Sequence, residues 1–361
     1  MYNNEKIRKE NERPKRSFDT IIKAVATGMF ILSIFLNIVF VVLIIILGSA
    51  LGAAKYKDKE ESGYRKVYTE NGHLTSKGMM NEFAVVRING IITEYDRNNR
   101  VFEYSENTVS AVTNRLNIIK KDNNIKGVLL VIESPGGAVT ASDILWHAVL
   151  KFKEQSGLPI ITIMKQVAAS GAYYIAAATD YIIAYPTTIT GSIGVIMYNF
   201  NIKGLLDKYG VEYVAIKTGE YKDLMSPFKE IDEEELSWMQ DVVDQMLERF
   251  IDAVISGRKN LTRSKVLELA DGRVYIAKDA LENGLIDEIG YFEDAVDVLS
   301  ERSGVTNPNL VEYQRERNIR DIFGWVLSEF RPGSITDVLN YDEGINRYGM
   351  FFLWDGVLKT R

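Results

Sequence analysis

The chain has 361 residues, 46% hydrophobic and 25% charged, which suffices for one large globular domain or two small ones. Its net charge of −6 gives little electrostatic support for nucleic-acid binding. It has no cysteine and only two histidines, His73 and His147, which excludes a disulfide framework, a thiol nucleophile and a cysteine-based zinc site. We expect no metal ion and no other cofactor.

An uncharged segment, residues 24–54, consists mainly of Ile, Leu, Val, Phe and Ala. It is longer than the roughly 20 residues that a helix needs to cross a bilayer core. Residues 1–23 are basic, so the positive-inside rule predicts that they form a cytoplasmic tail. Residues 24–54 would then be a single-pass anchor in the cell membrane, with the following domain extracytoplasmic. Lysines also follow the segment, which weakens the charge asymmetry. The alternatives are a cleaved signal sequence, with small residues 48–54 as its cleavage region, and a buried core helix.

Beyond the anchor, polar residues 55–81 predict a linker. Residues 82–304 alternate short apolar runs with helical patterns, which predicts an α/β domain with parallel strands. The C-terminal extension, residues 305–361, has no run long enough for a second membrane span. The expected strands are Phe83–Ile88, Val128–Ile132, Ile160–Met164, Tyr181–Ala184 and Val211–Ile216, and the expected helices are Asn107–Lys120, Ala138–Glu154 and Glu233–Ile255.

A glycine pair, Gly136 and Gly137, follows the apolar run Val128–Ile132. Two adjacent glycines let the backbone turn with its N–H groups directed outward, where they can bind a developing oxyanion. A tight turn without a catalytic role explains the same pattern.

A serine, Ser170, stands among small residues where the strand Ile160–Met164 leads into a helical pattern. The arrangement is analogous to a nucleophile elbow, although the G-x-S-x-G pattern is absent. The N–H of Gly171, at a helix start, is placed to stabilise negative charge. The alternative is a helix N-cap serine in a small-residue packing site.

A serine nucleophile needs a base to take its proton. His73 lies in the predicted linker and His147 in the middle of an apolar helical pattern, so we interpret both as structural. A lysine can act instead if burial lowers its pKa toward about 7–8.

Five motifs in order carry a resemblance to a known family. They are ESPGG at 133–137, AASGAYY at 168–174, TITGSIGV at 188–195, GEYKD with SPF at 219–228, and DGRVY at 271–275. From about residue 83 to 299 the chain resembles the bacterial signal peptide peptidase A (SppA) family. Those enzymes are serine peptidases with the ClpP/crotonase fold, an α/β fold of repeated ββα units.

The resemblance implies a catalytic Ser/Lys dyad of Ser170 and Lys222. It also implies an oxyanion hole built from backbone N–H groups, which we assign to Gly137 and Gly171, with Gly136 as the weaker candidate. Ser192 is expected beside the dyad, although a capped turn explains it equally well. Short, single-copy relatives form rings that share active-site residues, so a homo-oligomer is expected. Ala172 departs from the family pattern, which usually has glycine there, and so does Ala138, where Ser or Thr is frequent.

Three other functions share some of these features. An NfeD-type membrane serine protease would share the chemistry but usually carries further C-terminal membrane spans. A crotonase-like acyl-CoA enzyme would share the fold, but an outward-facing anchor would keep it from CoA. A catalytically inactive scaffold would need no dyad. Clp protease itself needs a histidine about 25 residues after the serine, and residues 190–195 contain none.

The expected substrates are remnant signal peptides or other apolar peptides at the membrane. We also hypothesise that the aromatic run Tyr348–Trp354 lies in the active-site groove as a self-inhibiting strand.

Overall fold

The computed structural model describes residues 15–56, 64–70, 73–74, 81–94, 106–315 and 351–353. The chain divides into two compact units, residues 1–63 and residues 64–361. In the first unit, the predicted anchor lies within one helix, α2 (Lys15–Tyr56). Its segment Val25–Leu43 is the one described helix long and apolar enough to cross a membrane, and none of it is buried in protein. Its length and composition fit a membrane anchor and a cleaved signal sequence alike.

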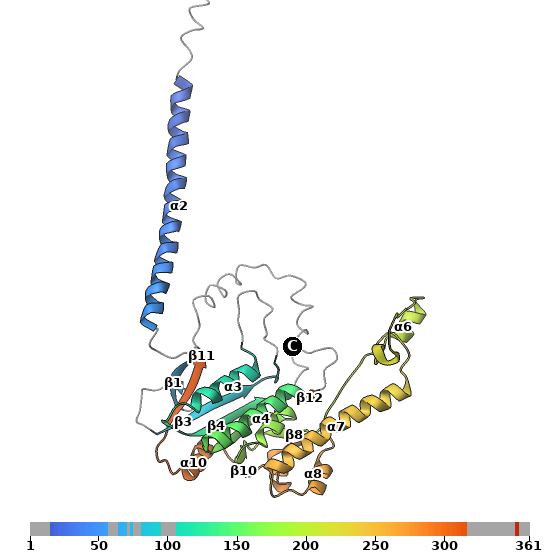
Figure 1. Ribbon diagram of the computed structural model, residues 1–361. Coiled ribbons are helices and arrows are strands. Elements are labelled where there is room, and N and C mark those ends of the chain that lie inside the picture. Colours follow the sequence, from blue (N-terminus) through green and yellow to red (C-terminus); the bar gives the residue numbers. More distant parts are fainter. Residues whose placement is uncertain are drawn as a thin grey trace, which may run out of the picture. The chain divides into compact units, whose positions relative to one another are not determined.

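The second unit is built on a mixed sheet (Figure 1). Its central strands run parallel, so their carboxyl ends lie at one edge, together with the two glycine-rich junctions that follow β4 and β6. A short strand, β8 (Ile189–Gly191), pairs with the end of β6, and β9 (Val274–Ile276) pairs with β8. The spatial order of the main strands is β10 (Glu288–Ile289), β7 (Tyr181–Ala184), β6 (Ile160–Ala169), β4 (Ile125–Ser134), β3 (Glu82–Asn89), β11 (Asn309–Arg315), β1 (Tyr64–Glu70), β2 (His73–Leu74).

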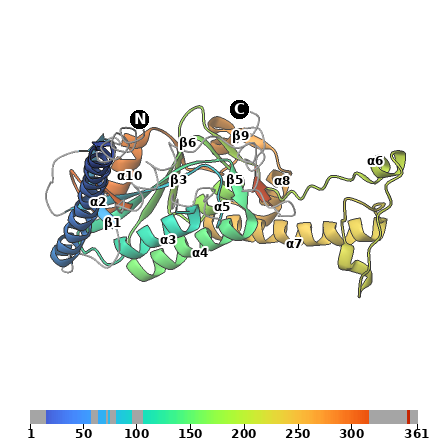
Figure 2. The ribbon, with the colours of Figure 1, turned by 90° about the horizontal axis from the view of Figure 1, so that it is seen from above.

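Helices cover both faces of this sheet (Figure 2). One face packs against α3 (Thr108–Ile119), α4 (Val139–Ser156) and α5 (Gly171–Ala176) in the larger core. The other packs against α10 (Phe292–Ser303) in a smaller core. Because the sheet is covered on both faces, β3 and β4 are buried at nearly every position rather than at alternate ones.

Three more helices lie between β8 and β10 in the chain. They are α7 (Glu233–Gly257), α8 (Arg263–Leu269) and α9 (Ala277–Glu282). The helices expected from the sequence are confirmed as α3, α4 and α7, and the strands expected between Phe83 and Ala184 are confirmed as β3, β4, β6 and β7.

The strand expected at Val211–Ile216 is wrong. The segment has no strand structure, and the side chains of Val214 and Ile216 are 73% and 101% exposed. A strand needs a neighbour for its backbone hydrogen bonds, and none of the described strands lies beside this segment. Apolar, β-branched residues therefore stand at the surface here.

The sheet is also wider than predicted. Strand β1 lies within residues 55–81, which were expected to form a linker, and it pairs antiparallel with β11 from the C-terminal extension. Strand β11 in turn pairs parallel with β3. Lys66 of β1 helps to hold this edge by ion pairs with Glu82 and Asp122.

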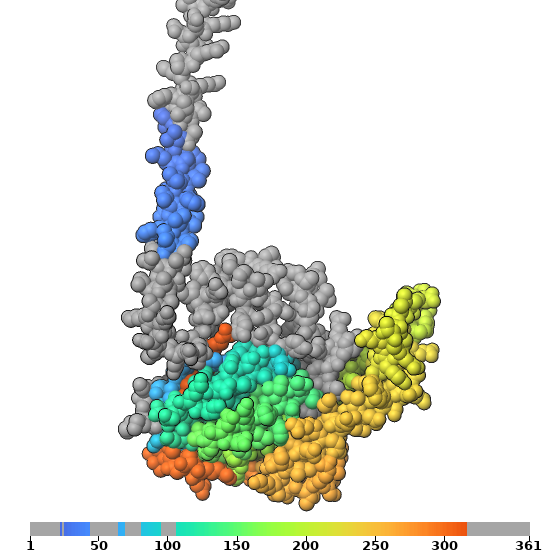
Figure 3. Space-filling view, in the orientation of Figure 1, coloured from blue at the N-terminus to red at the C-terminus, as the bar shows by residue number. Residues whose placement is uncertain are grey.

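Residues 196–232 form an arm between β8 and α7. It contains helix α6 (Lys203–Lys208) and a 3₁₀ turn, η1 (Glu220–Asp223). Figures 1 and 2 both show α6 at the end of α7 remote from β8, and Figure 3 shows the arm projecting from the body. The last turns of α7 are buried in the body through Phe250, Ile251 and Val254.

Candidate active site

Ser170 lies at a sharp turn between β6 and α5. Its backbone has φ 56° and ψ −120°, a conformation that a residue with a side chain rarely adopts. The turn is fixed by a hydrogen bond from the Ser170 N–H to the carbonyl of Gly191 (2.8 Å). Ser170 is only 1% exposed. Such a strained strand–turn–helix junction is the geometry of a nucleophile elbow, as the small residues around Ser170 predict.

The glycine pair forms a short strand, β5 (Gly136–Ala138), beside Ile92. The N–H of Ile92 donates to the carbonyl of Gly136, and the N–H of Ala138 donates to the carbonyl of Ile92, each over 2.9 Å. Because backbone groups alternate along a strand, the N–H and carbonyl of Gly137 face the opposite edge. A Cβ at Gly137 would lie 2.1 Å from the Ile92 carbonyl oxygen, so only glycine fits.

The fold brings this strand to the serine. Strands β4 and β6 run parallel with Ser134 opposite Ala168, and β5 and α5, which follow them, are in contact. Gly171 is the first residue of α5, where an N–H has no acceptor within the helix. Two backbone donors, from Gly137 and Gly171, therefore flank the elbow of Ser170. The sequence could not show Ile92 as the support of β5.

Ser192 is also near the elbow, one residue beyond the Gly191 carbonyl that binds Ser170. It is 7% exposed, has φ 51°, and donates its N–H to the carbonyl of Arg273 (2.8 Å). The prediction that Ser192 lies beside the serine thus agrees with the backbone geometry, and its catalytic role stays a prediction.

Lys222 is not placed beside Ser170 within one chain. It lies in η1 on the arm, and its side chain is exposed. The turn is tied to the α6 region by hydrogen bonds from Ile202 N–H to the Pro227 carbonyl and from Asn199 Nδ2 to the Met225 carbonyl. A single chain therefore presents an elbow flanked by two backbone N–H groups, and the amine of Lys222 at a distance from it.

Neither histidine offers a base at the elbow. His147 is exposed on α4, and His73 belongs to β2, at the far edge of the sheet from β6. Among the described residues, no three His, Asp or Glu side chains gather in an arrangement that could hold a metal ion.

Comparisons with known proteins identify the family. A family model for peptidase family S49 matches residues 152–306, and one for Clp protease matches residues 91–189. The chain is 39% identical over 271 residues to a putative signal peptide peptidase SppA of Enterococcus faecium, covering 72% of this chain and 78% of that protein. A putative protease of Methanocaldococcus jannaschii is 35% identical over 287 residues, covering 80% and 88%. The chain belongs to peptidase family S49.

Other members matched include Protease 4 of Haemophilus influenzae, 34% identical over 274 residues, which cover 72% of this chain and 42% of that longer protein. The predicted resemblance to SppA and the Clp protease-like α/β fold are confirmed. This chain is accordingly a serine peptidase, and the readings as an acyl-CoA enzyme or an inactive scaffold are not supported.

In this S49 peptidase, helix α5 is fixed by its two tyrosines. Tyr173 is fully buried, and its hydroxyl donates to the carbonyl of Leu285 (2.9 Å). Burial raises the pKa of Tyr173 above its usual range, so it remains a neutral donor. Tyr174 donates to Asp143 of α4 and packs edge-on against Phe250 of α7, with ring centroids 5.0 Å apart. Helix α5, which follows Ser170, is thus fixed to α4, to α7 and to the segment around Leu285.

The C-terminal extension also reaches the site. Residues Phe351–Leu353 form a strand, β12, that pairs antiparallel with β5. Phe352 stands opposite Gly137, on the edge that the Gly137 N–H faces. Strand β12 also contacts α4 and α5. Residues 351–353 therefore lie beside the glycine pair, and self-inhibition by this run stays a hypothesis. The rest of Tyr348–Trp354 lies outside the described residues.

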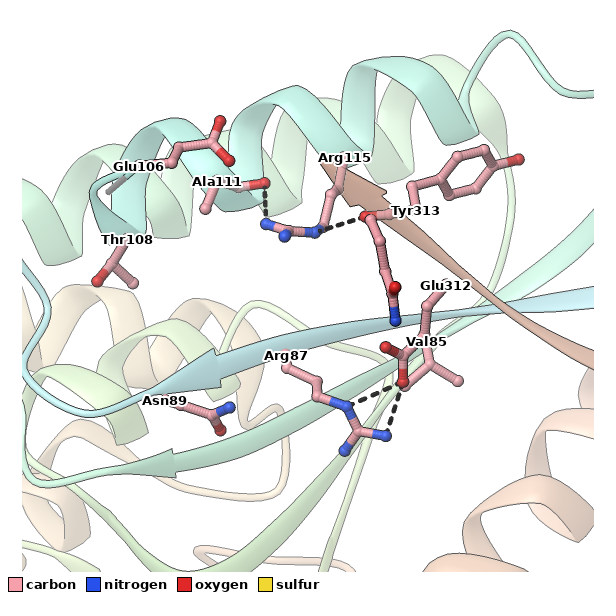
Figure 4. A pocket seen from close by; sticks show the side chains of 10 residues that line it. Val85, Arg87, Asn89, Glu106, Thr108, Ala111, Arg115, Glu312 and Tyr313 are labelled. Atoms are coloured by element: carbon pink, nitrogen blue, oxygen red, sulfur yellow. Dashed lines mark hydrogen bonds and ion pairs between the residues drawn. The ribbon is translucent and has the colours of Figure 1, made fainter. Parts of the chain in front are cut away.

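A cavity of about 290 Å³ opens elsewhere, between α3, β3 and β11 (Figure 4). Its wall includes the ion pair of Arg87 with Glu312 (2.7 Å) and Arg115, which donates to the carbonyls of Ala111 and Tyr313. None of the predicted site residues lines it. Its charged groups are already paired, so we assign no catalytic role to it.

Proposed function

We propose that this S49 peptidase cuts peptides with a Ser170/Lys222 dyad in which the two residues come from different copies of the chain. The observation that carries the proposal is the division of the site: the elbow and its oxyanion donors stand on the body, while Lys222 stands on the arm. A neighbouring copy that docks its arm would bring the amine to the serine.

The exposed surface of the arm supports a second copy as its partner. Large apolar side chains are exposed there, which is unusual unless they are covered in an assembly. They include Phe200 (77% exposed), Tyr209 (72%), Val214 (73%) and Ile216 (101%). A head-to-tail contact of this kind, with arm on body, generates a ring when its rotation closes.

The proposed chemistry is acyl transfer. Neutral Lys222 accepts the Ser170 proton while the serine Oγ attacks the scissile carbonyl, and the N–H groups of Gly137 and Gly171 stabilise the oxyanion. The charged lysine then protonates the leaving amine as the C–N bond breaks. Water, deprotonated by the lysine, hydrolyses the ester and frees Ser170.

The proposed substrates are extended apolar peptides at the membrane, such as remnants of signal peptides. The first relative is named a putative signal peptide peptidase, and residues 24–54 would anchor the enzyme, with residues 1–23 in the cytoplasm and the catalytic domain outside. A substrate strand would add to the edge of β5 that β12 occupies, by the same kind of backbone hydrogen bonds. Strand β12 would then compete with substrates.

The direct test is peptidase activity of the full chain in detergent micelles on a fluorogenic apolar peptide. Ser170→Ala and Lys222→Ala should each reduce kcat/KM by several orders of magnitude without changing the oligomer seen by size-exclusion chromatography. Full activity in the lysine variant would refute the dyad. Cleavage of polar, soluble peptides in preference to apolar ones would refute the proposed substrate class and favour an NfeD-type protease.

A further inference from the structure

Ser134 carries a buried hydroxyl that the proposed mechanism does not use. It is the last residue of β4 and is 0% exposed. Its Oγ accepts the N–H of Gly136 (3.1 Å) and lies 3.4 Å from the carbonyl oxygen of the same residue, toward which it donates. In the parallel register of β4 and β6 it stands opposite Ala168, two residues before Ser170. Ser134 thus links the strand beside the elbow to the glycine pair.

The backbone N–H groups of β5 have different partners. That of Gly136 donates to the Ser134 hydroxyl, and that of Ala138 donates to the carbonyl of Ile92 (2.9 Å). The N–H of Gly137 faces the other edge, the one that β12 occupies. Because buried N–H groups need a partner, the first two are committed within the fold. Of the three, the N–H of Gly137 is the one that can serve a peptide bound at that edge.

The direction of this N–H is set by the peptide bond between Gly136 and Gly137. A trans peptide is planar, so its N–H and its C=O point in opposite directions. The carbonyl of Gly136 accepts from the N–H of Ile92 (2.9 Å), and the Ser134 hydroxyl lies against the same oxygen. While this carbonyl points toward Ile92, the N–H of Gly137 points toward the edge where a substrate would bind.

Glycine by itself does little to keep such a peptide in one orientation. Gly136 has φ 102°, a region that glycine adopts readily and other residues do not, and two adjacent glycines have no Cβ to oppose rotation of the peptide between them. Pro135, just before them, has no N–H with which to fix the turn. The hydrogen bonds with Ser134 and Ile92 oppose this rotation.

We propose that Ser134 is a positioning residue of the oxyanion hole, whose hydroxyl holds the glycine pair so that the N–H of Gly137 is directed at the scissile carbonyl oxygen. The inference rests on the proposed role of Gly137 as an oxyanion donor. Donors that are fixed before the reaction stabilise the developing charge without a cost of reorientation. Without the hydroxyl, the buried N–H of Gly136 would lose its partner, and the glycine pair would shift to find another.

The test compares binding of the ground state with binding of an oxyanion, in the full chain in detergent micelles. The first measurement is kcat and KM for a fluorogenic apolar peptide. The second is the inhibition constant of a peptide aldehyde of the same sequence. In that adduct Ser170 Oγ bonds to the aldehyde carbon, the serine proton passes to the base, and the carbonyl oxygen becomes the oxyanion.

Ser134→Ala should lower kcat by about 10–100-fold, less than the loss of a donor removed outright, and should raise the inhibition constant of the aldehyde by a similar factor. KM should change by less than about twofold, because the interaction lost is one made in the transition state. Ser134→Cys fills the same space with a group that bonds weakly, so it should behave as Ser134→Ala does.

Thr162→Val is the matched control. Thr162 is also 0% exposed, lies earlier in β6, and its hydroxyl bonds that of Thr179 (3.0 Å). The variant loses a buried hydroxyl and its hydrogen bond, as Ser134→Ala does. It should lower the Tm but leave kcat and the affinity for the aldehyde unchanged.

A Ser134→Ala enzyme with a lower Tm but unchanged kcat and aldehyde affinity would overturn the inference, because the hydroxyl would then act on stability alone. Equal weakening of KM and of aldehyde binding would overturn it too, since that result indicates a general distortion of the groove. So would wild-type kinetics in Ser134→Cys, which would make side-chain volume the cause. Full activity in Ser170→Ala would instead overturn the proposed function.

Discussion

A dyad shared between copies predicts that two inactive variants restore each other. Ser170→Ala keeps Lys222 on its arm, and Lys222→Ala keeps the elbow of Ser170, so a mixed assembly contains some sites with both groups. When equal amounts assemble at random, half of the sites receive an intact serine and half of those an intact lysine, so about one quarter of wild-type activity returns. The fraction does not depend on the number of copies in the ring.

The assay is co-expression of equal amounts of the two variants of the full chain with the same affinity tag, so that the purified pool keeps the random mixture of complexes. Fluorogenic peptide cleavage is then compared with each variant alone. A second mixture, of wild type with the double variant Ser170→Ala/Lys222→Ala, separates the two arrangements further. A shared dyad gives about one quarter of full activity, whereas a dyad within one chain gives about one half. Activity no higher than that of the single variants, together with one half in the second mixture, would refute the shared site.

Three further outcomes are expected. Gly137→Ala should lower kcat by about 10²–10³-fold, because the Cβ would push β5 away from Ile92 and displace an oxyanion donor. The control is Gly127→Ala, whose Cβ meets only the Leu299 side chain. It should lower stability but leave the kcat of the folded enzyme unchanged. Deleting residues 345–361 should raise kcat/KM by about fivefold, which corresponds to the loss of one competing hydrogen bond with a net value of about 1 kcal/mol. Unchanged kinetics would show that β12 does not compete with substrate. Asp122→Asn should lower the Tm at pH 7, and its difference from wild type should shrink as the pH falls below about 4. Although burial acts in the opposite direction, the bonds from Lys66 and Tyr313 lower the pKa of Asp122, so its stabilisation exists above its unfolded pKa and disappears as pH falls through the folded value.

The elbow was predictable because its cause is local. Few backbone conformations connect a strand directly to a helix at a serine flanked by small side chains. The positive φ of Ser170 is the one that such a junction requires. The glycine pair was predictable for the same reason. What the sequence did not contain was the reason why Gly137 must be glycine, since Ile92 lies 45 residues away and pairs with it only in the folded chain.

The failures of prediction have a common cause in tertiary structure. Val211–Ile216 has the composition of a buried strand, yet it is exposed on the arm. Periodicity and propensity report that a segment suits burial, but not whether the burying surface belongs to the same chain. Strand β1 shows the converse, since a polar segment becomes an edge strand because β11 offers it a partner. Neither outcome is encoded in the segment itself.

In the proposed assembly, Lys222 and the exposed apolar residues lie on the same arm. A protomer on its own would hold the turn at Ser170 without the proposed base. Docking of the apolar arm would at once bury its exposed side chains, exclude water from Lys222 and bring it to a serine. Assembly would then be the step that completes the proposed site, and an unassembled chain at the membrane would be unable to cut its neighbours.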